Sequence, residues 1–200
     1  MSFDVDTLGA ASAVNVDVYT RDFRISGSVQ TRFTRVAEIL NQLANAYLSV
    51  DHATISEHAD PSATRGAPQA WVAVDQILLM IAPDLGGEAR ADMRIPKRPV
   101  LAQLLLPPLR VTGRIHVPMG GRPIDGLLNV TDRYVAMTEA TLESGLHPDL
   151  GRSTAAVAIR RDRAHILLVA DDENSEQLLA DVLDERTAES WLLHRAEDEG

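Results

Sequence analysis

The chain has 200 residues, of which 45% are hydrophobic and only 4% aromatic, so its core must be built mainly from Val, Ile, Leu and Ala. This length suits one large domain or two small ones. The chain has no cysteine, which excludes disulfides and thiolate metal sites and agrees with a reducing cytosol.

The net charge of −10 is unevenly distributed. Residues 171–200 hold eleven acidic and two basic residues, whereas residues 1–170 hold 18 acidic and 17 basic residues. A nucleic-acid-binding protein needs a basic surface for phosphate contacts, and an acidic tail opposes it, so nucleic acid is not an expected partner. The first 13 residues lack signal-peptide features, and no apolar run approaches the roughly 18 residues of a membrane-spanning helix. We therefore expect a soluble cytoplasmic protein without membrane contact.

Four blocks of sequence recur in the same order, most of them about 87 residues apart, which predicts an internal duplication. The matched blocks are 24–29 with 110–115, 39–41 with 127–129, 47–55 with 134–142, and 77–80 with 166–169.

The first predicted element is a strand, because Val14, Val16 and Val18 alternate with other residues at the period of a half-buried strand. A turn is expected at 20–22, followed by a second strand. Gly27 falls inside this second strand and predicts a bulge or sharp bend, as does its match Gly113 in the second unit.

A short helix is expected next, because four apolar residues between 33 and 40 recur at helical spacing. In the second unit the corresponding stretch, 118–123, is rich in glycine and proline and predicts a loop.

The remaining elements are predicted to be strands. Third strands are expected over 46–55 and 133–142. Segments 70–82 and 155–170 are each expected to form a fourth strand, or a hairpin around Arg161-Asp162 in the second unit. Leu101–Leu106 is expected to open the second unit, with a turn at Pro107-Pro108.

The order of these features resembles the Sm-like and SH3-like small β-barrels. The resemblance rests on Arg24-Ile25-Ser26-Gly27 followed by Asn45-Ala46-Tyr47-Leu48, and it covers about 35 residues of each unit. It implies a small-barrel fold but not the RNA binding of the Sm family, whose Asp and Met-Asn pair before the third strand are missing here. The repeats are also similar to an uncharacterised group of short bacterial domains, which implies no activity.

The predicted architecture is mainly β, with two tandem barrel-like or curved-sheet repeats related by pseudo-twofold symmetry, a short helix and a C-terminal helix. The predicted organisation is a flexible N-terminus (1–13), a first repeat (14–85), a linker (86–100), a second repeat (101–171) and an acidic C-terminal helix or tail (172–200).

The acidic tail carries a capping-box pattern at 174–177 and an apolar stripe after it. Trp191, Leu192 and Leu193 form a second apolar patch. They either pack on their own protein or serve as an anchor for a protein partner or a second copy, since Trp is favoured at interface hot spots.

Few residues point to chemistry. Gly120, Gly121 and Arg122 form a turn that is alternatively an anion cradle built from backbone N–H groups. The cluster between Asp51 and His58 reads as a solvated strand end rather than a metal site, because His52 and His58 would lie about 20 Å apart on an extended strand. No nucleotide-binding, hydrolase or metalloprotease motif is present, and no cofactor is expected.

These observations favour a non-enzymatic cytoplasmic binding or scaffolding protein that engages another protein or forms a homo-oligomer. One alternative is a small-ligand or anion sensor with a groove between the repeats. Another is an enzyme whose site is composed from both repeats.

Overall fold

The computed structural model describes residues 11–85, 97–122 and 131–169. We call residues 11–85 the first half and residues 97–169 the second half. The fold is mainly β, as predicted, with the strands joined in one antiparallel sheet. The first half contains β1 (Ser12–Tyr19), β2 (Phe23–Thr31), α1 (Val36–Asn41), β3 (Tyr47–Glu57), β4 (Thr64–Ala73), the 3-10 helix η1 (Val74–Gln76) and β5 (Leu79–Ile81). The second half contains β6 (Lys97–Leu106), β7 (Leu109–Pro118), β8 (Tyr134–Glu143), η3 (Pro148–Leu150), β9 (Arg152–Arg160), η4 (Arg161–Arg163) and β10 (Ile166–Val169).

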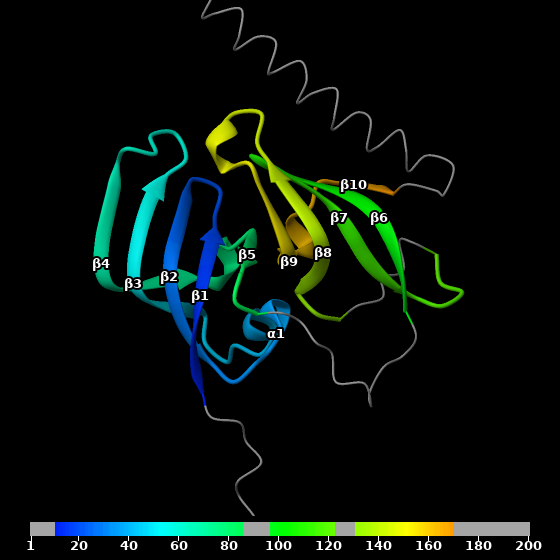
Figure 1. Cartoon of the computed structure of the whole chain (residues 1–200), viewed down its shortest axis with the longest axis horizontal. Coiled ribbons are helices and arrows are strands. Elements are labelled where there is room, and N and C mark those ends of the chain that lie inside the picture. Colours follow the sequence, from blue (N-terminus) through cyan, green and yellow to red (C-terminus); the bar gives the residue numbers. More distant parts are fainter. Residues whose placement is uncertain (1–10, 86–96, 123–130, 170–200) are drawn as a thin grey trace, which may run out of the picture.

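The strands of the two halves follow the same order in the sheet. The full order is β10-β6-β7-β8-β9-β5-β1-β2-β3-β4, so the first half reads β5-β1-β2-β3-β4 and the second half reads β10-β6-β7-β8-β9. The two five-strand groups are joined where β5 pairs with β9 (Figure 1). We call this pairing the inner junction.

Two parts of the predicted architecture differ from the observed sheet. Strand pairing does not close either half into a barrel, because the sheet runs open from β10 to β4. The expected pseudo-twofold relation is wrong. A twofold axis would pair like strands, or would pair β10 with β4 as well as β5 with β9, whereas among the described residues only β5 pairs with β9 and β10 and β4 end the sheet. The halves therefore follow one another head to tail.

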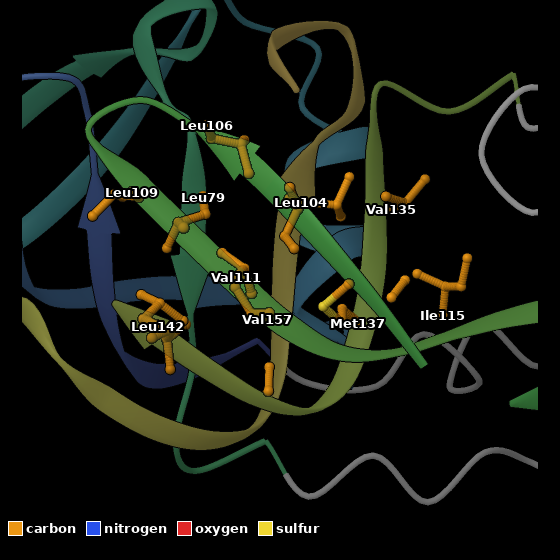
Figure 2. Close-up of a cluster of buried hydrophobic side chains, with 14 of the residues drawn as sticks. Leu79, Leu104, Leu106, Leu109, Val111, Ile115, Val135, Met137, Leu142 and Val157 are labelled. Atoms are coloured by element: carbon orange, nitrogen blue, oxygen red, sulfur yellow. The ribbon is translucent and has the colours of Figure 1, made fainter. Parts of the chain in front are cut away.

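Two apolar cores lie on opposite faces of the inner junction. One core is formed mainly by the second half and also takes Leu79 and Ile81 from β5 (Figure 2). The other is formed mainly by the first half and takes Tyr134 and Ala158 from the second half. Because side chains alternate along a strand, each half completes the core of its neighbour.

A bulge lies in the third strand of each half, where two residues oppose the predicted glycine of the second strand. The pairing of β2 with β3 shifts register around Gly27, and the pairing of β7 with β8 shifts around Gly113. A Cβ on Gly27 would lie 2.6 Å from the backbone oxygen of Asp51, and one on Gly113 would lie 2.9 Å from that of Thr138. Only glycine allows this close approach of the neighbouring strand.

Several predicted elements are confirmed and others need correction. The first strand buries Val14, Val16 and Val18 as expected, and α1 and both third strands are present. The single fourth strand is wrong in each half, because η1 and η4 each separate two strands. The alternative hairpin at Arg161-Asp162 is also wrong, since β10 pairs with β6 rather than with β9.

The predicted boundaries agree with the structure in part. The linker prediction reached residue 100, but residues 97–100 belong to β6. The predicted tail helix and its apolar patch at 191–193 lie outside the described residues. No helix in the described ranges is long and apolar enough to cross a membrane.

Candidate functional site

The predicted anion cradle lies in the turn that follows β7. Gly120 adopts a φ of +78°, and the N–H of Gly121 donates to the carbonyl of Pro118 at 3.0 Å. The Gly121 carbonyl accepts a hydrogen bond from Arg98 at 3.2 Å. The Gly121 N–H is therefore already used and does not point to an anion beside Arg122.

The four titratable residues at 51–58 do not gather in space. His52 is exposed at the irregular point of β3, where its φ is +50°. His58 is buried, and its Nε2 lies 3.1 Å from the carbonyl oxygen of Thr20. In the parts of the chain that the structure describes, no three His, Asp or Glu side chains are arranged to hold a metal ion.

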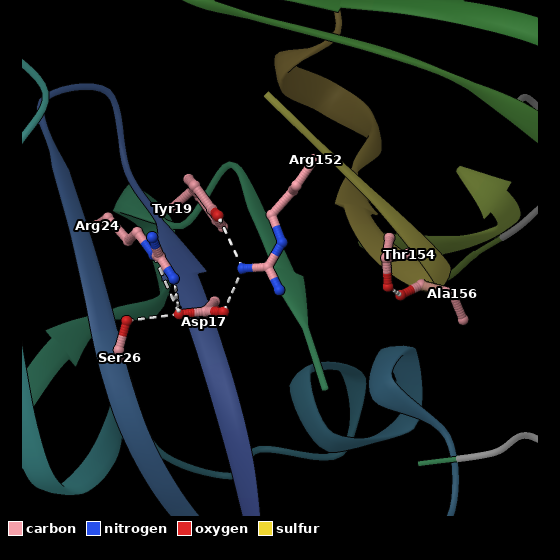
Figure 3. Close-up of polar contacts among 7 residues, drawn as sticks. All are labelled: Asp17, Tyr19, Arg24, Ser26, Arg152, Thr154 and Ala156. Atoms are coloured by element: carbon pink, nitrogen blue, oxygen red, sulfur yellow. Dashed lines mark hydrogen bonds and ion pairs between the residues drawn. The ribbon is translucent and has the colours of Figure 1, made fainter. Parts of the chain in front are cut away.

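A buried carboxylate links the two halves (Figure 3). Asp17 on β1 accepts hydrogen bonds from Ser26 and from Arg24, whose Nη2 lies 2.9 Å away. From the second half, Arg152 on β9 donates to the other carboxylate oxygen and lies 3.4 Å from the hydroxyl of Tyr19.

This cluster stabilises the fold rather than supplying an acid or base. Burial raises the pKa of Asp17, but the hydrogen bonds from Ser26 and Arg152 and the charge of Arg24 outweigh it, and the pKa lies below its usual value. A carboxylate held ionised by two guanidinium groups is a poor proton acceptor at neutral pH. Its role is to tie β1 to β9 across the inner junction.

A second polar contact between the halves is made by Tyr134 at the start of β8. The side-chain amide of Asn41, at the end of α1, donates to the Tyr134 carbonyl at 2.8 Å and accepts from its N–H at 2.9 Å. The Tyr134 hydroxyl donates to the carbonyl of Val74 at 2.6 Å. Burial raises the pKa of Tyr134 to about 12, so the hydroxyl remains a donor.

A pocket of about 580 Å³ lies beside this contact, between α1, the start of β3 and the segment before β8. Both halves line it, including Asn45, Tyr47, Asp75, Asp132 and Arg133. The predicted groove between the repeats has this counterpart in the structure. It does not include Gly120, Gly121 or Arg122.

The open ends of the sheet carry exposed apolar side chains. In the described residues, β4 pairs only with β3, and β10 pairs only with β6. Tyr47 and Trp71 lie on the same face of the β3–β4 pair, on the side away from the core. At the other end of the sheet, Ile166 and Leu168 point outward from β10. All four are exposed. We call these two strands with their side chains the open edges.

Sequence reasoning did not single out these edge residues. Tyr47 and Trp71 occur where neighbouring residues on the same strand, such as Leu48 and Val72, are already buried in the core. An apolar residue on the second face of a strand was the available signal, but the same pattern describes a strand buried on both faces.

No protein-family model, no curated protein and no solved structure matches this chain.

Proposed function

We propose that this protein is a non-enzymatic binding or scaffolding protein that engages another polypeptide through the open edges of its sheet. The observation that carries the proposal is the exposure of Trp71, Ile166 and Leu168 on the two edge strands and of Tyr47 on β3, next to β4. Unpaired backbone N–H and C=O groups on an edge strand are a template for another strand. Aromatic side chains beside that template add apolar contact area.

The origin and the location of this protein follow the same proposal. The shared strand order and the matched bulges support an origin of both halves from one duplicated unit, related to the small Sm-like and SH3-like folds. The absence of cysteine from these 200 residues supports a cytoplasmic location.

The pocket between the halves supports a second candidate function, the binding of a small ligand. Its volume of about 580 Å³ falls within the range of about 300–1,000 Å³ that ligand sites occupy. Arg133 and the carboxylates of Asp75 and Asp132 provide charged groups at its wall. A ligand bound in this pocket would contact residues of both halves.

The proposed function is tested by cross-linking the full chain in a cell extract and mapping the linked peptides by mass spectrometry. We expect links from β4 or β10 to a polypeptide, either a second copy or a different protein. Trp71→Glu should abolish the links at β4. Leu146→Glu is the matched control, because Leu146 is exposed in the loop before η3 and away from both edges. Links that persist in Trp71→Glu, or links confined to other surfaces, contradict the proposal.

A further inference from the structure

The inner junction shows how an edge strand of one half pairs with an edge strand of the other. β5 and β9 pair antiparallel with Leu79 opposite Ile159, Met80 opposite Ala158 and Ile81 opposite Val157. The N–H of Arg160 extends the pairing by donating to the Leu78 carbonyl at 2.8 Å.

The two halves can be matched residue by residue from their strand registers. Both third strands contain one residue with a φ of +50°, His52 in the first half and Glu139 in the second, and each is one of the two bulge residues that oppose the glycine. The pairings of β3 with β4 and of β8 with β9 then place residues 87 apart in equivalent positions. Tyr47 corresponds to Tyr134, and Trp71 corresponds to Ala158.

The same correspondence holds for the short last strand of each half. In the first half Leu79 pairs with Tyr19 at the end of β1. In the second half Ile166 pairs with Leu105, the equivalent position on β6. Ile166 therefore corresponds to Leu79, two residues away from the match that the sequence blocks suggested.

Residues that the inner junction buries are exposed at their equivalent positions on the open edges. Tyr134 is 1% exposed and its counterpart Tyr47 is 51% exposed, while Ala158 is fully buried and Trp71 is 61% exposed. On the other edge, Leu79 and Ile81 are fully buried, whereas their counterparts Ile166 and Leu168 are 49% and 42% exposed. These four counterparts are the majority of the seven large apolar side chains exposed in the described residues.

We propose that the partner of the open edges is a second copy of this chain, bound head to tail. In this arrangement β10 of one copy pairs antiparallel with β4 of the next, in the register of the inner junction. Leu167 then lies opposite Trp71, and Ile166 lies opposite Val72. The inference rests on the proposed function and names the partner of the same surface.

The edges favour a second copy over an unrelated strand because each is complementary to the other. Ile166 and Leu168 occupy the positions from which Leu79 and Ile81 enter a neighbouring core. At the inner junction, the Tyr134 hydroxyl contacts the carbonyls of Val74 and Ile77 beside η1. Tyr47 occupies the position equivalent to Tyr134 and would face the equivalent 3-10 helix, η4, of a second copy. Two unlike, complementary edges produce a ring if the rotation closes and a filament if it does not.

The proposed pairing of β10 with β4 of a second copy, which we call the outer junction, should be weaker than the inner junction. Asp17, which binds Arg152 across the inner junction, has Gln103 as its counterpart, and Arg152 has Arg65. A neutral amide replaces the carboxylate, so no ion pair forms there. Association is therefore expected to be reversible and to depend on protein concentration.

The test is the mass of the full chain in solution, measured by sedimentation and light scattering, alone and with two edge variants. Trp71→Glu blocks the β4 edge and leaves β10 intact. Leu168→Glu blocks the β10 edge and leaves β4 intact. Both positions are exposed, so each variant should fold, which circular dichroism verifies. Leu146→Glu is the control for a charge placed on an exposed leucine elsewhere.

The unmodified chain and Leu146→Glu are expected to assemble beyond the 21.8 kDa monomer at about 100 μM, a concentration that populates interfaces of micromolar affinity. Each edge variant alone is expected to be a monomer. An equimolar mixture of the two has one intact β10 and one intact β4, so it should form a dimer of twice the monomer mass and nothing larger.

Three outcomes overturn the inference. The first is a Leu168→Glu chain that still dimerises, which means that β4 pairs with itself. The second is a mixture that stays monomeric although the unmodified chain assembles. The third is an unmodified chain that is monomeric at this concentration. If that monomer still forms edge-specific cross-links to a different protein, the proposed function stands and only the second copy is excluded.

Discussion

The inner junction and the open edges use equivalent strands in two different environments. At the inner junction, β5 and β9 are covered on both faces and their backbone groups are paired. At the open edges, the equivalent strands β10 and β4 present the same positions to solvent. In the parts of the chain that the structure describes, neither five-strand group pairs its two edges with each other. One edge of each half pairs with the other half, and the second edge has no strand partner among the described residues.

The largest expected difference between the two environments is at the two equivalent tyrosines, Tyr134 and Tyr47. Tyr134→Ala removes a buried ring and its hydrogen bond to Val74, and it should lower the free energy of unfolding by about 4 kcal/mol. Tyr47→Ala, at the equivalent exposed position, should change it by no more than about 0.5 kcal/mol when measured by urea unfolding of the dilute monomer. Equal effects would contradict the structural distinction between the two edges.

The next effect concerns Asp17 and Gln103, which occupy equivalent positions in the two halves and make different polar contacts. Asp17→Ala leaves Arg24 and Arg152 without their shared carboxylate and should cost about 3 kcal/mol, the low end for a broken buried pair because both arginines are partly exposed. Gln103→Ala removes a neutral hydrogen bond to Thr112 and should cost about 1 kcal/mol. Denaturant unfolding of both variants checks the order, and a larger cost for Gln103→Ala would reverse it.

The two bulges should respond alike, since both halves need the same close approach. Gly27→Ala and Gly113→Ala should each lower the free energy of unfolding by about 2 kcal/mol, because the added methyl group meets the adjacent strand within 3 Å. Gly66 in β4 is the matched control, since a Cβ there has no neighbour within 4 Å. Thermal unfolding of the three variants measures the effect, and a neutral Gly27→Ala would show that the bulge relaxes.

The smallest effect is a pH dependence at His58, where the halves touch through its ring and that of His147. Burial lowers the pKa of His58, although the Thr20 carbonyl and the nearby Asp149 and Asp22 oppose this. Its Nδ1 is buried and has no hydrogen-bond partner among the residues that the structure describes, so protonation there is unfavourable.

Below the ordinary histidine pKa of 6.5 the unfolded chain therefore binds more protons at this residue than the folded chain. The free energy of unfolding should fall as the pH drops from above 6.5 toward 5. Unfolding measured across this range in the unmodified chain and in His58→Gln isolates the contribution. A variant with the same pH dependence would assign it to other groups.

Much of the local structure could be read from the sequence because it depends on short-range patterns. The alternation of Val14, Val16 and Val18 predicted both the strand and its buried face. Gly27 and Gly113 marked where each sheet pairing is irregular, although the extra residue of each bulge lies in the neighbouring strand. The break in the fourth strand at η1 was missed, whereas a break at Arg161-Asp162 was considered only as a hairpin. The sequence did not predict that the chain leaves its strand at η1 and η4, because this depends on the pairing of β5 with β1 and of β10 with β6.

The candidate sites show a similar division. The turn at Gly120 and Gly121 was predicted as one of two interpretations, and its hydrogen bond is local. The Asp17–Arg152 contact joins residues 135 positions apart, and no spacing rule connects them.

By itself the sequence determined that the chain is mainly β, that similar blocks occur twice, and that a glycine falls at the same place in each copy. These properties follow from side-chain periodicity and from residue identity, which can be read over a few residues. Only the tertiary structure decided that the halves share one open sheet and join head to tail. Strand pairing is set by which edges find a partner, and that depends on packing between residues far apart in the chain. The same reason explains why Tyr134 is buried while Tyr47, in a similar stretch of sequence, faces solvent.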